Sequence, residues 1–231
     1  MDLKTKLKPP HNYDVGMTTR VKTCFLLDIT ASMEPWIQAS KNKIREIINS
    51  LPADTKVAFV GYRDYDDAER FVIQPFGSVD DLLTAIRDVH ADGGNDIAED
   101  VAGGLYQAQQ LNWDDADVKT LIHIADAPAH GHEFHEAWVS DDHPEGDAEH
   151  HPCTILQEMS HHGIDYTFVR VDEMTDTMTY MLAQAYESGP GKFKVIDLYK
   201  QENHRNFARD ITRSITLSIE RYSESQDPEL P

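Results

Sequence analysis

The feature that most constrains the fold is a repeated alternation of short apolar segments with longer amphipathic segments. Strands are predicted at 21–27, 57–62, 71–73, 119–125, 164–169 and 193–196, and 119–125 is almost continuously apolar, which is typical of a strand buried on both faces. Helices are predicted at 33–51, 79–89, 96–111, 154–161, 175–186 and 202–222. This alternation predicts an α/β fold: a doubly wound (Rossmann-like), mostly parallel sheet with helices on both faces and one short antiparallel edge strand.

The organisation along the chain of 231 residues indicates one domain, because no linker interrupts the alternation. Residues 1–20 carry Pro9 and Pro10 and few apolar side chains, so we expect a flexible N-terminal arm. The domain is expected to span 21–222, with an acidic, histidine-rich insert at 127–152. Residues 223–231 are expected to form a frayed C-terminal tail.

The charge of the chain excludes several classes of partner. A net charge of −20 argues against nucleic acid and against anionic membrane surfaces, both of which need clustered lysine and arginine. Between residues 88 and 169 there are 18 acidic residues and one basic residue, Lys119. No apolar run approaches the roughly 18 residues of a membrane span, and Cys24 and Cys153 do not make a disulfide framework. We therefore expect a cytoplasmic protein whose partner on this acidic part is cationic or brings a metal.

Oxygen-bearing side chains follow the predicted strands at the points where those strands end. In an open α/β sheet, ligands bind beyond the carboxyl ends of the strands, where the strand order reverses. Carboxylate and hydroxyl oxygens placed there suit a hard divalent cation. The predicted metal ligands are Asp28, Thr30, Ser32, Asp96 and Asp126.

Each of these residues also has a simpler structural interpretation. Thr30 or Ser32 could cap the helix predicted to begin near residue 33. Asp96 and Glu99 have the spacing of a capping box at the start of the helix predicted at 96–111. Taken singly, these interpretations compete with metal binding, but they do not predict the whole set in this order.

The set resembles the metal-ion-dependent adhesion site of von Willebrand factor type A domains. The resemblance covers residues 21 to about 220, and its three pieces occur in that family's order and approximate spacing. A closer likeness, to the alpha-kinase and hemicentin-like branches of the family, lies in residues 59–64 and 126–131. The three pieces are Asp28-x-Thr30-x-Ser32, then Gly93-Gly94-Asn95-Asp96, then Asp126 after an apolar strand.

The resemblance implies a metal-ion-dependent protein-binding module. In such domains hydroxyls and carboxylates hold Mg²⁺ or Mn²⁺ (Ca²⁺ is a further candidate), and one coordination position stays open for an acidic side chain of a protein partner. That oxygen ligand is expected to lie in an otherwise basic surface. This sequence has Thr30 in place of the usual first serine, which keeps the hydroxyl. Asp96 stands where many members have threonine, and a third carboxylate would tighten metal binding while weakening the ion's attraction for an acidic partner.

The acidic insert contains a second set of candidate metal ligands. Residues 126–151 hold six of the 12 histidines, eight acidic residues and no lysine or arginine. The spacing of His130, His132 and His135 could chelate Zn²⁺, with Asp141, Asp142, His143 or Cys153 as further ligands. Two alternatives remain open: a polar loop that shapes access to the first site, and a pH sensor, because imidazoles gain charge below pH ~6.5.

Enzymatic activity is not predicted. The alternative is a Mg²⁺-dependent phosphohydrolase that uses Asp28 as nucleophile, but its Asp-x-Asp motif needs an acid at the position of Thr30. The sequence contains no phosphate-binding Gly-x-x-x-x-Gly-Lys-Ser/Thr loop, no Gly-x-Ser-x-Gly elbow and no Gly-x-Gly-x-x-Gly motif after the first strand.

Overall fold

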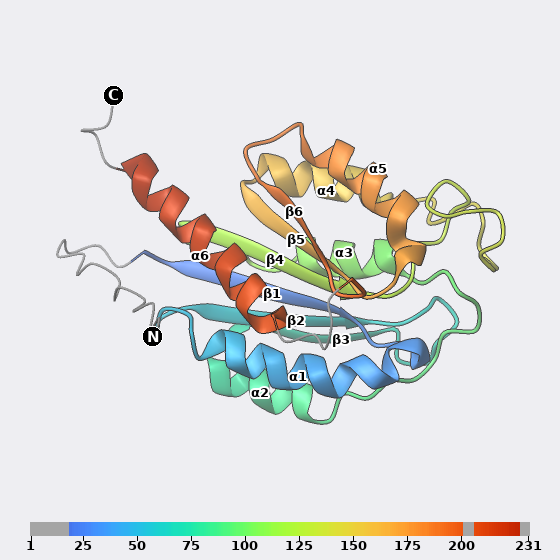
Figure 1. The fold of residues 1–231 in the computed structure, drawn as a ribbon, viewed down its shortest axis with the longest axis horizontal. Coiled ribbons are helices and arrows are strands. Elements are labelled where there is room, and N and C mark those ends of the chain that lie inside the picture. The colour runs from blue at the N-terminus through green and yellow to red at the C-terminus, as the bar shows by residue number, and fades with distance from the viewer. Residues whose placement is uncertain (1–18, 201–205, 227–231) are drawn as a thin grey trace, which may run out of the picture.

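The computed structural model describes residues 19–200 and 206–226, and within these ranges six strands form one sheet. The strand order is β3-β2-β1-β4-β5-β6, and only the β2–β3 pairing in this sheet is antiparallel. This is the predicted mostly parallel sheet with one antiparallel edge strand (Figure 1). The strands are β1 (Val21–Asp28), β2 (Lys56–Tyr62), β3 (Phe71–Gly77), β4 (Val118–Ala125), β5 (Ile164–Arg170) and β6 (Phe193–Asp197).

Helices cover both faces of the sheet, as predicted. One face carries α1, α2 and α6, and the other carries α3, α4 and α5 (Figure 1). Short 3₁₀ turns at Ala31–Met33 and Glu173–Thr175 precede α1 and α5. The helices are α1 (Glu34–Ile48), α2 (Val79–Arg87), α3 (Val101–Gln109), α4 (Pro152–His161), α5 (Asp176–Tyr186) and α6 (Phe207–Gln226).

The alternating side chains of the central strand β1 divide the core into two apolar clusters. Phe25 and Leu27 point to the cluster under α1, α2 and α6, whereas Cys24 and Leu26 point to the cluster under α3, α4 and α5. All four side chains are buried, as expected for a strand covered on both faces. The two-sided core holds the carboxyl end of β1 rigidly in the middle of the sheet.

The helix predicted at 96–111 begins later than expected, and this difference matters for the site. Helix α3 begins at Val101, with the Asp100 side chain accepting a hydrogen bond from the backbone of Gly103 at 2.7 Å. The preceding residues are held by the insert instead: Glu99 N donates to Pro128 O at 2.9 Å. The predicted capping box of Asp96 and Glu99 is therefore wrong, because Asp100 caps the helix.

Other element boundaries differ by a few residues. Helix α1 ends at Ile48, β3 continues to Gly77, and α6 continues to Gln226, so the predicted tail cannot begin at residue 223. The arm predicted at 1–20 lies almost wholly outside the described residues, as do 201–205 and 227–231. Among the helices of the described part, none is long and apolar enough to cross a membrane.

A buried histidine on β4 contacts tyrosine side chains on β5, the next strand, and on β2, which lies beyond β1. His123 is fully buried, with Nε2 at 2.9 Å from the hydroxyl of Tyr62 and Nδ1 at 2.7 Å from that of Tyr166. Burial lowers the pKa of His123 to about 3, so the ring stays neutral at physiological pH. Both ring nitrogens have partners, which accounts for a polar ring buried in the core.

Candidate metal centre

The first site lies where the chain leaves β1 and β4 in opposite directions. From β1 the chain passes through α1 to β2 on one side, and from β4 it passes through α4 to β5 on the other side. Asp28 is the last residue of β1, and Asp126 follows the last residue of β4. Because β1 and β4 pair in parallel with Leu27 opposite Ile124, the two carboxylates meet at the same edge of the sheet.

Four of the predicted ligands form one hydrogen-bonded chain. Asp28 Oδ1 accepts bonds from the backbone of Thr30 at 2.9 Å and from its hydroxyl at 2.7 Å. The Thr30 hydroxyl lies 3.2 Å from that of Ser32, which donates to Asp126 Oδ1 at 3.1 Å. Asp28 and Thr30 are buried, whereas Ser32 is exposed. This chain of hydrogen-bonded side chains therefore leads from the end of a buried strand to the surface.

These oxygen-bearing side chains fit a cation because one of their carboxylate oxygens has no hydrogen-bond partner. Asp28 is fully buried, and its Oδ2 has no hydrogen-bond partner. Burial, together with the nearby Asp126 charge, raises the pKa of Asp28 to about 8, and burial also raises the pKa of Asp126. A buried carboxylate oxygen without a donor is costly, and a divalent cation among these groups would satisfy it.

Glu99 is a fifth member of this group that sequence reasoning missed. It is only 3% exposed, its Oε2 has no partner, and its side chain interacts with the Thr30 hydroxyl. Burial, followed by the charges of Asp28 and Asp64, raises the pKa of Glu99 to about 10. The only sequence signal was its spacing from Asp96, which pointed to a capping box instead.

The Gly93-Gly94 loop fits closely against this group. Both glycines have positive φ, 82° and 77°, and the backbone of Ala31 donates to Gly93 O at 3.1 Å. A Cβ atom on Gly94 would lie 2.5 Å from Glu99 Oε1 and 3.3 Å from Thr30 Cβ. Only glycine therefore allows this loop to approach Thr30 and Glu99 so closely.

Asp96 lies in a neighbouring group and is not part of the hydrogen-bonded chain. Its Oδ2 accepts a hydrogen bond from the backbone of Asp142, and its Oδ1 is buried without a partner. One ligand atom from each of Asp96, Asp64 and His130 falls within 4.8 Å of the others. Direct ligation of the first ion by Asp96 thus stays a prediction, and the structure gives Asp96 other neighbours.

The predicted histidine site is split in two. His130 and His135 both contact Asp141, at 2.8 and 2.9 Å. His132 does not join them: it is exposed, and its Nδ1 lies 2.9 Å from the carbonyl oxygen of Pro144. Of the further candidates, Asp141 lies at the centre of this cluster.

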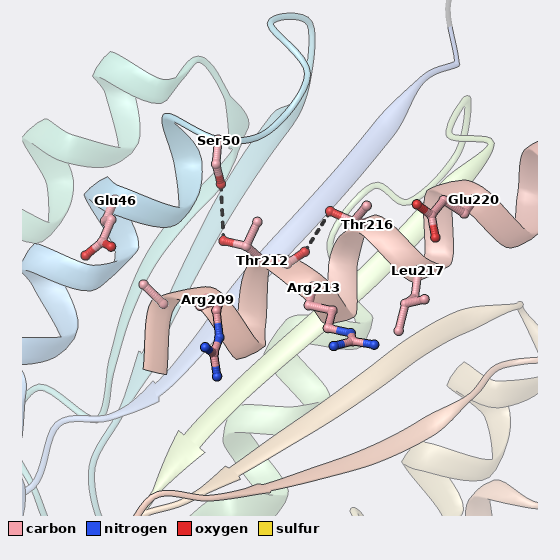
Figure 2. Close-up of a pocket in the computed structure, with 9 residues that line it drawn as sticks. Glu46, Ser50, Arg209, Thr212, Arg213, Thr216, Leu217 and Glu220 are labelled. Carbon is pink, nitrogen blue, oxygen red and sulfur yellow. Dashed lines mark hydrogen bonds between the residues drawn. The ribbon is translucent and has the colours of Figure 1, made fainter. Parts of the chain in front are cut away.

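A separate groove of about 560 Å³ lies between α1 and α6 (Figure 2). Ser50, just after α1, and Thr212, on α6, bridge its walls with hydroxyl oxygens 3.1 Å apart. Acidic and basic residues both line it, including Glu46, Arg209 and Arg213. None of its lining residues belongs to the metal ligands predicted above, so the groove adds nothing to the site.

Comparisons with known proteins agree with this architecture. No family model matches the sequence. The chain is 33% identical over 134 residues to the alpha-protein kinase vwkA of Dictyostelium discoideum, a match that covers 55% of this chain and 21% of that kinase. The chain thus spans about a fifth of the length of this relative.

Solved structures resemble the chain over most of its length. A von Willebrand factor type A protein from Catenulispora acidiphila is 16% identical with a TM-score of 0.54, covering 87% of this chain and 43% of the other. Proximal thread matrix protein 1 from the mussel byssus, in a structure with a zinc-occupied MIDAS motif (the abbreviation for a metal-ion-dependent adhesion site), is 17% identical with a TM-score of 0.52, covering 84% and 45%. This chain therefore has the fold of von Willebrand factor type A domains.

Proposed function

We propose that this chain is a metal-ion-dependent protein-binding module. The observation that carries the proposal is the hydrogen-bonded chain from Asp28 through Thr30 and Ser32 to Asp126, with Asp28 Oδ2 buried and unpaired. Glu99 supplies a further buried carboxylate beside Thr30. We assign these five residues to one ion, with Glu99 in the position that sequence analysis gave to Asp96.

The ion is Mg²⁺ or Mn²⁺, since every donor in the set is oxygen. Asp28, Asp126 and Glu99 hold it by charge, while the Thr30 and Ser32 hydroxyls contribute neutral donors. Ser32 is the exposed member of the set, so a partner would approach the ion from the side of Ser32. The zinc-occupied MIDAS motif of the mussel protein, which has a similar fold, supports cation binding by this chain.

The partner is a protein that presents an oxygen ligand within a basic surface. The ion would coordinate that oxygen, and basic residues around it would face the acidic insert, which carries no lysine or arginine between 126 and 151. We infer a cytoplasmic setting, because both cysteines are free and Cys24 is buried in the core.

Phosphohydrolysis through Asp28 is disfavoured by the geometry. A nucleophile must reach the phosphorus of its substrate, but Asp28 is fully buried and its Oδ1 already accepts two hydrogen bonds from Thr30. Thr30 also stands where the motif of such enzymes needs an acid. Turnover of p-nitrophenyl phosphate that disappears in Asp28→Asn would reverse this choice.

The test of the binding function has two steps. Calorimetric titration with Mn²⁺ should show binding by the wild-type protein that is lost in Asp28→Asn. Affinity capture from lysate should then retain a partner in Mg²⁺ but not in EDTA, and Asp28→Asn should retain none in either buffer. Equal Mn²⁺ binding by both proteins would disprove the site, whereas ion binding without cation-dependent capture would disprove the partner role.

A further inference from the structure

A second group of ligand atoms lies next to the proposed first site, where the loop after β2 meets the insert. Asp64, in the loop, and His130, in the insert, are each 3% exposed although they are distant in sequence. His130 Nε2 lies 2.6 Å from Asp64 Oδ1. The insert, drawn in yellow-green, loops beyond the carboxyl ends of the strands (Figure 1). Backbone bonds fix it there, since His130 N donates to Glu99 O at 3.2 Å.

Asp141 sets the orientation of the His130 ring. It accepts four bonds of 2.8–2.9 Å, from the rings of His130 and His135 and from the backbones of Gly131 and His143. Because two backbone N–H groups already donate to the Asp141 carboxylate, it also acts as the acceptor for His130, and His130 Nδ1 donates in their shared bond. Nε2 is the nitrogen that faces Asp64.

Asp96 completes a group of three ligands. Its Oδ2 is held by the backbone of Asp142, and its Oδ1 is buried with no partner. Ligand atoms of Asp64, Asp96 and His130 lie within 4.8 Å of one another. A histidine whose second nitrogen donates to a carboxylate is the common arrangement of a metal ligand, because the carboxylate fixes both tautomer and ring.

We propose that Asp64, Asp96 and His130 form a second cation site, separate from the Asp28 site, for a borderline transition ion such as Zn²⁺. Asp141 is its positioning residue. The imidazole selects Zn²⁺ over Mg²⁺ or Ca²⁺, which prefer oxygen alone. Three protein ligands leave one position of a tetrahedral ion open to water or to a partner. This proposal does not depend on the function of the first site.

The ion-free geometry shows what the cation would replace. The short contact between His130 Nε2 and Asp64 holds a proton between them, and the ion takes that proton's place. Ligands of a tetrahedral Zn²⁺ with bonds of about 2.0–2.1 Å stand roughly 3.3 Å apart, so this pair must open from 2.6 Å by under ~1 Å.

The test is zinc titration against a chromophoric chelator in excess Mg²⁺, which occupies the first site. Wild-type protein should bind one tight Zn²⁺, and Co²⁺ in its place should give visible absorption bands that Zn²⁺ removes. Asp96→Asn and His130→Gln should weaken Zn²⁺ binding at least ~100-fold, at the upper end of what loss of a metal-site partner gives. Asp96→Asn keeps the acceptor for the Asp142 backbone and lies at a partly exposed position, so it tests the site even if His130→Gln fails to fold.

Two variants serve as matched controls. His132→Gln removes a histidine of the same insert that contacts only a backbone carbonyl, and it should leave Zn²⁺ affinity unchanged. Asp28→Asn disables the first site and should also keep the tight Zn²⁺. Unchanged affinity in Asp96→Asn and His130→Gln would show that the cluster is an ion-pair network only. Loss of the tight Zn²⁺ in Asp28→Asn would place zinc in the first site; either result overturns the proposal.

Discussion

Replacing Asp28 with asparagine should abolish the stabilisation of the fold by Mg²⁺ or Mn²⁺ without unfolding the protein. The amide keeps an oxygen that can accept the two bonds from Thr30, at 2.9 and 2.7 Å. It also removes a buried negative charge beside Asp126. In EDTA, the free energy of unfolding of the variant should therefore lie within about 1 kcal/mol of the wild-type value, or above it.

The magnitude follows from linkage between ion binding and folding. A cation at 100 times its dissociation constant stabilises the native state by about 2.7 kcal/mol, and each further tenfold increase adds about 1.4 kcal/mol. For a domain of this size, 1 kcal/mol shifts the melting temperature by roughly 2–4 °C. The wild-type melting temperature should thus rise by roughly 5–11 °C at that concentration and then by about 3–6 °C per decade.

The assay is thermal unfolding in EDTA and in a series of Mg²⁺ and Mn²⁺ concentrations. Asp80→Asn, at an exposed position in the first turn of α2, removes the same charge away from the site and should respond like the wild type. Two results would refute the reasoning. One is a wild-type melting temperature that does not change when millimolar cation is added. The other is an Asp28→Asn variant whose melting temperature rises with cation as steeply as that of the wild type.

Three further predictions concern other parts of the structure. Acid should destabilise the protein through His123, whose pKa is lowered to about 3 in the folded state. Below pH 6.5 the unfolded chain binds a proton at this residue that the native ring does not bind. The free energy of unfolding should therefore fall by roughly 1.4 kcal/mol per pH unit. Urea unfolding at pH 6.5 and 5.0 should show wild-type stability falling about 2 kcal/mol further than that of His123→Gln; equal losses would contradict the assignment. Gly94→Ala should weaken Mn²⁺ binding because its Cβ would meet Glu99, whereas Gly163→Ala, at a similar φ of 69° with nothing within 4 Å, should carry only the backbone strain of about 1 kcal/mol. If calorimetry gives both variants wild-type affinity, Glu99 is not a ligand. Ser32→Ala should lower Mn²⁺ affinity roughly tenfold while leaving stability in EDTA within ±0.5 kcal/mol, because the side chain is exposed; a large loss of stability would assign Ser32 a structural role.

The sheet and one half of the site could be predicted because both depend on local pattern. Apolar runs ending at Asp28 and Asp126 place these carboxylates at the same edge of any parallel sheet in which β1 and β4 pair. Thr30 and Ser32 follow within four residues, so their hydroxyls stay near Asp28 whatever the rest of the chain does. The comparisons with solved structures support the same fold.

The other half could not be predicted because it depends on contacts between distant residues. Asp96 and Glu99 are three residues apart, and the sequence offered both as members of a helix cap. The backbone of the insert decides between them: Ile97 and Ala98 donate to Ser140 O at 3.1 and 3.2 Å, and this segment therefore stays outside α3.

The sequence by itself determined the order of strands and helices, the acidity of the insert and the residues that end the central strands. Only the tertiary structure decided which acids share a site, because loops that lie about 30 to 70 residues apart in the sequence meet beyond the sheet and bond through their backbones. Because these loops meet, Glu99 lies beside Thr30, and Asp96 lies beside Asp64 and His130. Local periodicity carries no information about such contacts, since they arise from how the insert packs on the finished sheet.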